Sequence, residues 1–181
     1  MGKILLDLLV ALIATNGQFD DDADGRDVSG ADLAEEHVVA ATEAAQDVDH
    51  PQVTPSLLLA MAAIESNYNP TAVSRVQGGK RVTGMWGSTR PVGSGPRFCG
   101  VLQTIAGHQW GTCLAQRELS TGYLAGAKEM VVWLKVAKGD LRAALRGHGC
   151  GMWGLRNRCN NYDVRVLRVK HRLDKMSKPE A

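Results

Sequence analysis

The chain has 181 residues, of which 44% are hydrophobic and 22% are charged, as in an ordinary soluble domain. This length allows one hydrophobic core, and the absence of a run of about 18 apolar residues argues against a membrane-spanning helix. The net charge of +2 conceals two halves of opposite sign. Residues 1–65 contain 13 acidic and 2 basic residues, whereas residues 66–181 contain 6 acidic and 19 basic ones. The basic half favours polyanionic partners.

The N-terminal residues 1–14 have a basic start and an apolar middle, as in a signal peptide. Asp7 interrupts the apolar run, and no clear cleavage site follows it. Three interpretations stay open at this point: a signal peptide, an anchor that contacts a membrane surface, and a short helix over 3–16 that packs on the rest of the chain.

The next segment, residues 19–27, reads FDDDADGRD and contains the D-x-D-x-D-G start of a calcium loop. Alternate carboxylates converge on one hard cation in such a loop, and the glycine permits its sharp turn. The acid expected at the twelfth position of an EF-hand comes one residue late. We therefore expect a structural Ca²⁺ site with one inserted residue, and the alternative is a solvated acidic linker. The candidate ligands are Asp20, Asp22, Asp24 and Asp32.

Apolar periodicity, capping residues and glycine or proline breaks predict a mainly helical fold. One face of the helix expected after the acidic loop carries Ala34, Val38, Ala41, Ala45 and Val48. A long loop or small β-ribbon is expected at about 77–99, where Gly, Ser, Thr and Arg dominate. The expected helices span residues 31–47, 56–66, 103–117, 120–138, 140–147 and 160–174.

Four cysteines, at positions 99, 113, 150 and 159, form two pairs that are close in sequence. Proximity favours the disulfides Cys99–Cys113 and Cys150–Cys159, each of which closes a short loop and contributes roughly 3 kcal/mol. A Cys99–Cys150 bond, a zinc site and four reduced thiols are the alternatives. Disulfides persist in non-reducing compartments, so this interpretation points to a periplasm, a cell wall or a virion.

Glu65 is the strongest candidate for a catalytic residue, because it lies at the end of the most apolar predicted helix of the main body. Burial raises the pKa of a carboxyl group toward the value that a general acid needs near neutral pH. The alternative is a glutamate that points into water at a helix end. No acid occurs between Glu65 and Glu118, so Glu65 is expected to act as a lone carboxyl group.

Four segments resemble, in order, the motifs of soluble lytic transglycosylases, which are related to goose-type lysozyme. Residues 63–74, AIESNYNPTAVS, resemble the signature around the catalytic glutamate, and 100–103, GVLQ, resemble a Gly-Leu-Met-Gln segment. Residues 140–151 resemble the helix that leads into Ala-Tyr-Asn-Ala-Gly, and 158–167 resemble the closing Thr-Arg-Asn-Tyr-Val helix. Together they cover roughly residues 51–172.

The resemblance implies a lysozyme-like fold in which Glu65 is the catalytic acid and base. It implies that Ser66, Gln103 and Tyr162 line the cleft. His148 stands where the family has a tyrosine and Gly149 where it has an asparagine, so contacts with the sugar subsites differ. His148 is kept as a substrate-binding candidate.

The implied activity is cleavage of the β-1,4 bond between N-acetylmuramic acid and N-acetylglucosamine in peptidoglycan, with 1,6-anhydro ends as products. This chemistry requires no cofactor, so calcium would be structural. A hydrolytic lysozyme and a non-catalytic wall-binding virion or ejection protein are the alternatives. A basic protein that binds nucleic acid or lipid is a further alternative. The sequence contains no known nucleic-acid module, so nucleic acid is not expected as a partner.

The resemblance and the compact size suggest a bacteriophage enzyme that acts at entry or at lysis, with peptidoglycan strands and other virion proteins as partners. Three segments are expected: an N-terminal EF-hand-like unit over 1–50, a transglycosylase domain over 51–175, and a tail over 176–181.

Overall fold

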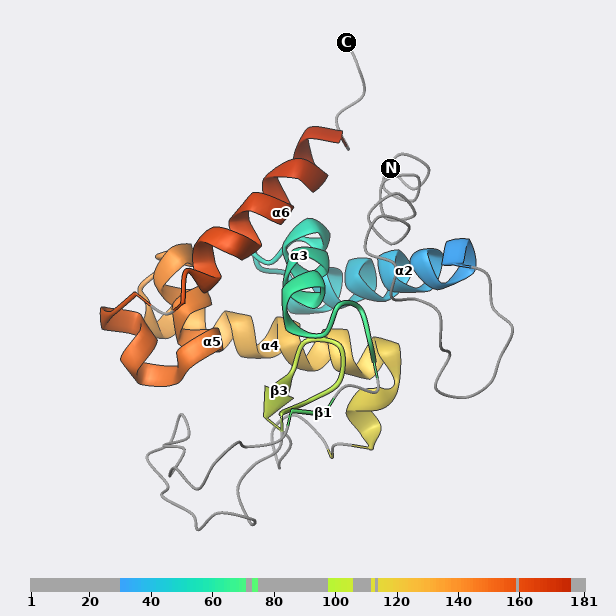
Figure 1. Cartoon of the computed structure of the whole chain (residues 1–181), viewed down its shortest axis with the longest axis horizontal. Helices are drawn as coiled ribbons and strands as arrows, with labels where there is room; N and C mark the ends of the chain where they lie inside the picture. The colour runs from blue at the N-terminus through green and yellow to red at the C-terminus, as the bar shows by residue number, and fades with distance from the viewer. Residues whose placement is uncertain are drawn as a thin grey trace.

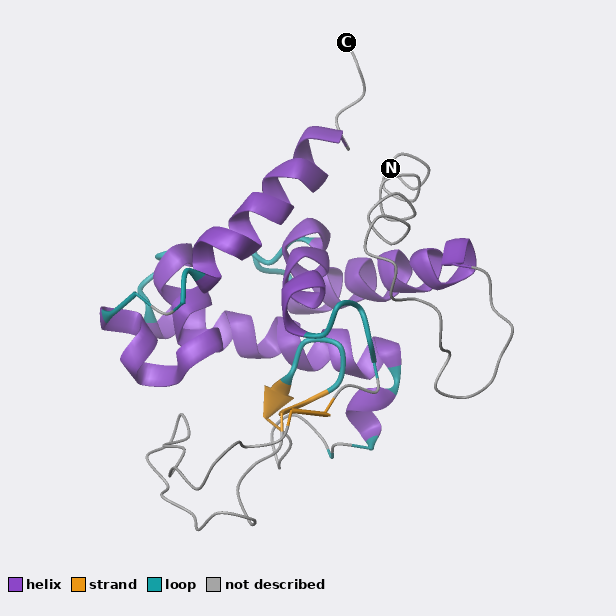
Figure 2. Cartoon of the chain, viewed as in Figure 1, coloured by secondary structure: helices purple, strands orange, loops and turns teal. Residues whose placement is uncertain are grey.

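The structure is a computed structural model that describes residues 30–70, 73–74, 98–105, 112, 114–158 and 160–176. This part of the chain is mainly helical, as predicted, with one very small sheet (Figures 1 and 2). Among the residues described, no helix is both long and apolar enough to cross a membrane. The elements are α2 (Gly30–Val48), α3 (Pro55–Glu65), β1 (Val73–Ser74), β2 (Phe98–Cys99), β3 (Thr104–Ile105), η1 (Ala115–Arg117), α4 (Leu119–Val136), α5 (Leu141–Arg156) and α6 (Tyr162–Met176).

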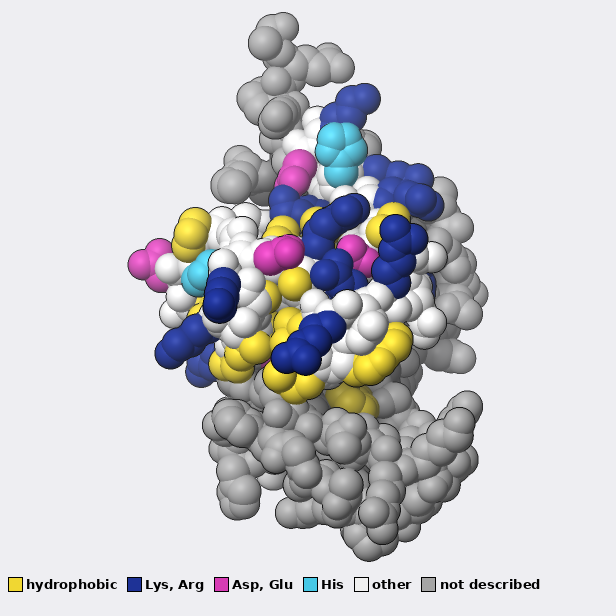
Figure 3. Space-filling view, turned by 90° about the vertical axis from the view of Figure 1, so that its left-hand side faces the viewer, with side chains coloured by type: hydrophobic (Ala, Val, Ile, Leu, Met, Phe, Trp, Pro, Cys, Tyr) yellow, Lys and Arg dark blue, Asp and Glu magenta, His cyan; other side chains and the backbone are white. Residues whose placement is uncertain are grey.

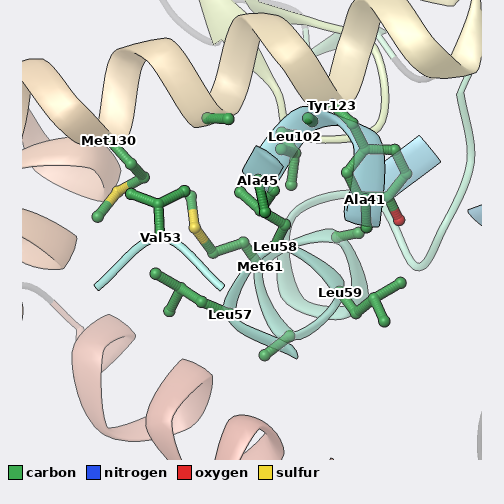
Figure 4. Close-up of a cluster of buried hydrophobic side chains, with 14 of the residues drawn as sticks. Ala41, Ala45, Val53, Leu57, Leu58, Leu59, Met61, Leu102, Tyr123 and Met130 are labelled. Carbon is green, nitrogen blue, oxygen red and sulfur yellow. The ribbon is translucent and has the colours of Figure 1, made fainter. Parts of the chain in front are cut away.

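Helix α3 lies at the centre of the fold, and α2, α4 and α6 pack against it (Figure 1). Its residues 56–62 are all buried, which is typical of a helix that is apolar on every side. Full burial of each leucine contributes roughly 1.5–3 kcal/mol. Figure 4 shows Leu57, Leu58, Leu59 and Met61 of α3 among Ala41, Ala45, Val53, Leu102, Tyr123 and Met130.

Helix α2 belongs to the same core, although its residues were expected to form part of a separate N-terminal unit over 1–50. Ala34, Ala41 and Ala45 are buried, and Val38 and Val48 are partly buried, so the predicted apolar face is confirmed. Small alanine side chains let α2 approach α3 and α4 closely. The predicted helices 31–47, 56–66, 120–138 and 160–174 agree with α2, α3, α4 and α6 to within two residues.

The ends of α3 are fixed by local interactions that the sequence indicates. Thr54 caps the N-terminus, where its hydroxyl accepts a hydrogen bond from the Leu57 amide at 3.2 Å, and Pro55 begins the helix. At the other end Asn67 and Tyr68 adopt positive φ values of 53° and 65°, so the helix cannot continue. Glu65 is therefore the last residue of the central helix.

The three short strands form one antiparallel sheet in the order β1–β2–β3. Here the prediction of a helix over 103–117 is wrong in the residues described. Thr104 and Ile105 are β-branched, which favours extended backbone, and they pair with Cys99 and Phe98. Among the residues described between 103 and 117, only η1 is helical, and Gln116 accepts a hydrogen bond from the Thr104 hydroxyl at 2.7 Å.

Helix α5 is longer than the predicted 140–147, because its glycines do not end it. A Cβ at Gly147 would collide with the Trp133 ring, and one at Gly149 would collide with the Tyr162 ring. These glycines therefore allow close packing on α4 and α6. The helix is kinked at Gly151, where φ is 64°.

A buried histidine joins α2 to α4. His37 is 2% exposed, and its Nδ1 lies 2.8 Å from the Tyr123 hydroxyl. The ring also meets the edge of Tyr68, with centroids 5.3 Å apart. Burial lowers the pKa of His37 to about 4, although a backbone hydrogen bond with Tyr68 acts in the opposite direction.

This depressed pKa makes folding stability pH-dependent. The unfolded chain takes up the proton below about pH 6.5 and the folded chain only below about pH 4. We therefore expect the free energy of unfolding to fall as the pH is lowered through this window, by about 2–3 kcal/mol from His37 alone. Thermal melts from pH 7 to 4.5 should show a shallower decline for His37→Gln than for wild type. His171→Gln, at an exposed position of α6, is the matched control, and equal slopes in wild type and His37→Gln would contradict the expectation.

Candidate active site

Glu65 projects from the end of α3 into a cluster of side chains from three other helices. Its side chain is 19% exposed, so it is mostly buried but remains partly open to solvent. The Glu65 Oε1 lies 3.5 Å from His148 Nε2 on α5, and Tyr162 at the start of α6 also interacts with the carboxyl group. The structure thus brings together three of the predicted site residues, Glu65, His148 and Tyr162.

A second carboxyl group lies behind His148. The Glu129 Oε1 on α4 is 3.6 Å from His148 Nδ1, and the two side chains are 4% and 1% exposed. The Trp133 indole donates a hydrogen bond to the same oxygen at 3.1 Å. Glu65 and Glu129 therefore approach opposite nitrogens of one imidazole ring.

Glu129 is thus a second carboxyl group near the site, separated from Glu65 by His148, and the expectation that Glu65 acts as a lone catalytic carboxyl group stays a prediction. Glu118, the first acid after the acid-free interval, is exposed at the start of α4 and takes no part. A signal for Glu129 is present in the sequence. Glu129 lies four residues from both Ala125 and Trp133, so the three side chains share one face of the helix. An acid on such an apolar face is costly to bury unless it is paired.

Burial raises the pKa of Glu65, and the negative charge of Glu129 acts in the same direction. The positive charge of His148, the hydroxyl of Tyr162 and the charge of Arg165 act in the opposite direction but do not cancel the effect. A carboxyl group with a raised pKa keeps its proton to higher pH, as a general acid requires.

Several polar atoms around Glu65 are buried without a hydrogen-bond partner of standard geometry among the side chains described. They are both ring nitrogens of His148, the Glu129 Oε2 and the Tyr162 hydroxyl. Such groups are rare in folded proteins and concentrate where function needs them. The arrangement can hold a proton at Glu65, whose side chain is the more exposed partner of His148.

Gly149 accounts for the position of Tyr162 in this cluster. A Cβ added at Gly149 would lie 2.9 Å from the Cγ of Tyr162. The tyrosine ring therefore occupies the space that a side chain would need.

Gly149→Ala should displace the Tyr162 ring and slow the reaction at Glu65 by about 10-fold to 100-fold, because small displacements of site groups are costly. Stability should fall by about 1–3 kcal/mol, because the buried tyrosine ring has to shift to make room for the methyl group. The measurement is the rate of glycan cleavage together with a thermal melt. Met152→Ala, at an exposed position of the same helix, is the control, and an unchanged rate in Gly149→Ala would contradict the role of Tyr162.

Ser66 follows Glu65 directly, and Gln103 lies in the turn that the Ser66 hydroxyl contacts. The Ser66 hydroxyl donates a hydrogen bond to the Val101 carbonyl at 2.8 Å, which ties the end of α3 to the turn between β2 and β3. The Gln103 amide donates to the Gly100 carbonyl at 2.9 Å within that turn. Gly100 has a φ of 74°, and a Cβ there would collide with the Gln116 backbone, so the turn requires glycine.

Two of the predicted disulfide cysteines can be described. Cys99 and Cys150 are both disulfide-bonded, so the alternative of reduced thiols is wrong for them. Cys113 and Cys159 lie outside the described residues, and the two pairings stay predictions. Cys99 precedes the turn at 100–103 and Cys150 follows the helical segment of His148, so the oxidised cysteines flank the site.

The predicted calcium ligands Asp20, Asp22, Asp24 and Asp32 lie outside the part of the chain whose side chains are described, as do residues 1–14. Among the side chains that are described, no group of three or more His, Cys, Asp or Glu residues could hold a metal ion.

No family model matches the chain, and no curated protein or solved structure is significantly similar to it.

Proposed function

We propose that the protein is a peptidoglycan lytic transglycosylase with a lysozyme-like fold, in which Glu65 is the acid and base. The observation that carries the proposal is the placement of Glu65. It is a partly exposed carboxyl group with a raised pKa, at the end of the central helix, beside buried polar groups of His148 and Tyr162. The four ordered sequence motifs support the same assignment.

The reaction follows from one carboxyl group that first gives and then takes a proton. Protonated Glu65 donates to the glycosidic oxygen, the bond to the anomeric carbon breaks, and its electron pair stays on the leaving sugar. The N-acetyl oxygen of the substrate stabilises the cationic carbon. The Glu65 carboxylate then accepts the proton of the muramyl C6 hydroxyl, whose oxygen closes the 1,6-anhydro ring.

The position of Glu129 favours this course over hydrolysis. A hydrolase of the inverting type needs a second carboxylate that activates water across the sugar from the acid. Glu129 is buried on the far side of His148 from Glu65 and is engaged by Trp133. The C6 hydroxyl is held within the substrate, and such intramolecular positioning is worth several powers of ten in effective molarity.

The charge of the surface supports an anionic cell-wall substrate. Figure 3 shows Lys and Arg side chains gathered on the face that α5 and α6 form. Such a face attracts anionic wall polymers and raises the rate of encounter. Exposed basic residues of these helices and the segment after α5 are Arg142, Arg156, Arg158, Arg165, Arg168, Arg172 and Lys175.

The oxidised state of Cys99 and Cys150 supports a non-reducing compartment. We place the enzyme in a phage virion or in the periplasm or cell wall of the host.

The test is mass analysis of the fragments released from purified peptidoglycan. The proposal expects ends of 1,6-anhydro-N-acetylmuramic acid, lighter by one water than hydrolytic products. Reducing muramic acid as the main product would identify a lysozyme instead. Binding to the wall without released fragments would identify a wall-binding protein and overturn the enzymatic assignment.

A further inference from the structure

Three side chains form a row that leads from the surface into the core. The Glu65 Oε1 is 3.5 Å from His148 Nε2, and the opposite ring nitrogen, Nδ1, is 3.6 Å from Glu129 Oε1. The exposed fractions of these side chains are 19% for Glu65, 1% for His148 and 4% for Glu129. The row is fixed at its inner end, where the Trp133 indole donates a hydrogen bond to Glu129.

This geometry favours the protonated imidazole over the neutral ring once Glu65 has lost its proton. A neutral ring has an N–H on one nitrogen and a lone pair on the other, so one of its nitrogens would present a lone pair to a carboxyl oxygen. An imidazolium presents an N–H on both sides. A cation between two acids also lowers the cost of burying Glu129, for which His148 is the one cationic partner among the ion pairs of the described residues.

We propose that Glu129 is a positioning residue that holds His148 as an imidazolium beside Glu65, so that a fixed positive charge faces the carboxylate that forms when Glu65 gives up its proton. The proposal deepens the function proposed above and rests on it for the role of Glu65. Glu129 itself does not contact the substrate and acts through His148.

The proton affinity of His148 agrees with this assignment. Burial alone would lower the pKa of the ring, but the charge of Glu129, its hydrogen bond and the charge of Glu65 outweigh burial and raise the pKa to about 9. The stability that this pair contributes is complete below about pH 6.5 and is lost as the pH rises through about 9. His148 is therefore cationic at neutral pH.

Among the residues described, helix α6 and the turn after β2 also face the ring. Helix α6 places the Tyr162 ring 6.1 Å from the His148 ring and adds the charge of Arg165, which acts on Glu65. The backbone of Leu102, in the turn after β2, favours the protonated ring. The two glutamates, on α3 and α4, thus dominate the charge around His148.

The consequence for the reaction is a balance of charge. With a proton on Glu65, the cationic His148 and anionic Glu129 leave the row neutral. When Glu65 donates its proton to the glycosidic oxygen, its carboxylate is already opposite an N–H of His148. Preorganised charge of this kind acts without rearrangement at the moment of reaction.

The experiment is an NMR titration of the full chain, in which the His148 signals are assigned by their loss in His148→Gln. In wild type at pH 8, the nitrogen shifts should be those of a doubly protonated ring, and the ring should titrate near pH 9. Glu129→Gln keeps the shape and should lower this midpoint by about one to three pH units. Glu118→Gln, an exposed acid at the start of the same helix, should leave it unchanged.

The pH profile of cleavage supplies a second readout that loss of structure alone would not produce. In Glu129→Gln the plateau of kcat should fall, and the alkaline limb should move to higher pH, because Glu65 loses its cationic neighbour. Glu129→Asp keeps the negative charge, so its kcat plateau and its alkaline limb should lie between those of Glu129→Gln and wild type.

A neutral His148 in wild type at pH 8, or the same midpoint in wild type and Glu129→Gln, would overturn the proposal whatever the activity. The titration uses no substrate, so its outcome is independent of the product analysis that tests the proposed function.

Discussion

Glu65→Gln should lose peptidoglycan cleavage almost completely, with a fall of about 10²–10⁴-fold in rate. The amide has the shape of the carboxyl group but can neither donate the acidic proton nor accept one from the C6 hydroxyl. The fold should be retained, because the side chain ends at the surface of the cluster and is 19% exposed. The measurement is the release of soluble fragments from purified peptidoglycan, with a thermal melt of each protein.

Glu118→Gln is the matched control for this experiment, since it removes one exposed acid at the start of α4. It should cleave at the wild-type rate. If Glu65→Gln kept more than about a tenth of the activity, Glu65 would not be the acid. The wild-type rate should also decline as the pH rises above the raised pKa of Glu65, because the acid form is then lost.

Leu58→Ala should produce the largest loss of stability, about 2–5 kcal/mol, because it leaves a cavity in a packed core. Leu58 is fully buried in α3, and Figure 4 shows it near Ala45 of α2 and Leu102. For a chain of this size the melting temperature should fall by roughly 5–15 °C. Chemical denaturation and calorimetry would measure both quantities.

Leu114→Ala removes the same atoms at a position that is 73% exposed, so its stability should change by less than about 0.5 kcal/mol. Equal losses in the two variants would mean that α3 is not the centre of the core. Because α3 also carries Glu65, a destabilised Leu58→Ala protein should lose activity at a lower temperature than wild type.

The long helices and the position of Glu65 could be predicted from sequence because their signals are local. Thr54 and Pro55 mark the start of α3, and the asparagine and tyrosine after Glu65 occupy the backbone conformation that ends it. The apolar stripe of α2 likewise predicted its buried face.

The errors arose where tertiary contacts decide the outcome. Gly147 and Gly149 resemble a helix end but lie inside α5, because Trp133 and Tyr162 pack directly on them. Residues 104–105 form a strand because β2 is there to pair with them. Glu129 could not be predicted from its distance to Glu65 along the chain, because the packing of α4 against α5 brings it to His148.

The position of Glu65 as the final residue of α3 has one more consequence. The peptide dipoles of a helix add up to a partial negative charge at its C-terminal end. A carboxylate there is opposed by the backbone itself, whereas a protonated carboxyl group is not. Part of the proton affinity of Glu65 therefore resides in the direction of the main chain, where no side-chain substitution can remove it. Variants of the surrounding residues should adjust this proton affinity without abolishing it. If the acid were moved to the first turn of a helix, the helix dipole would lower its proton affinity instead of raising it.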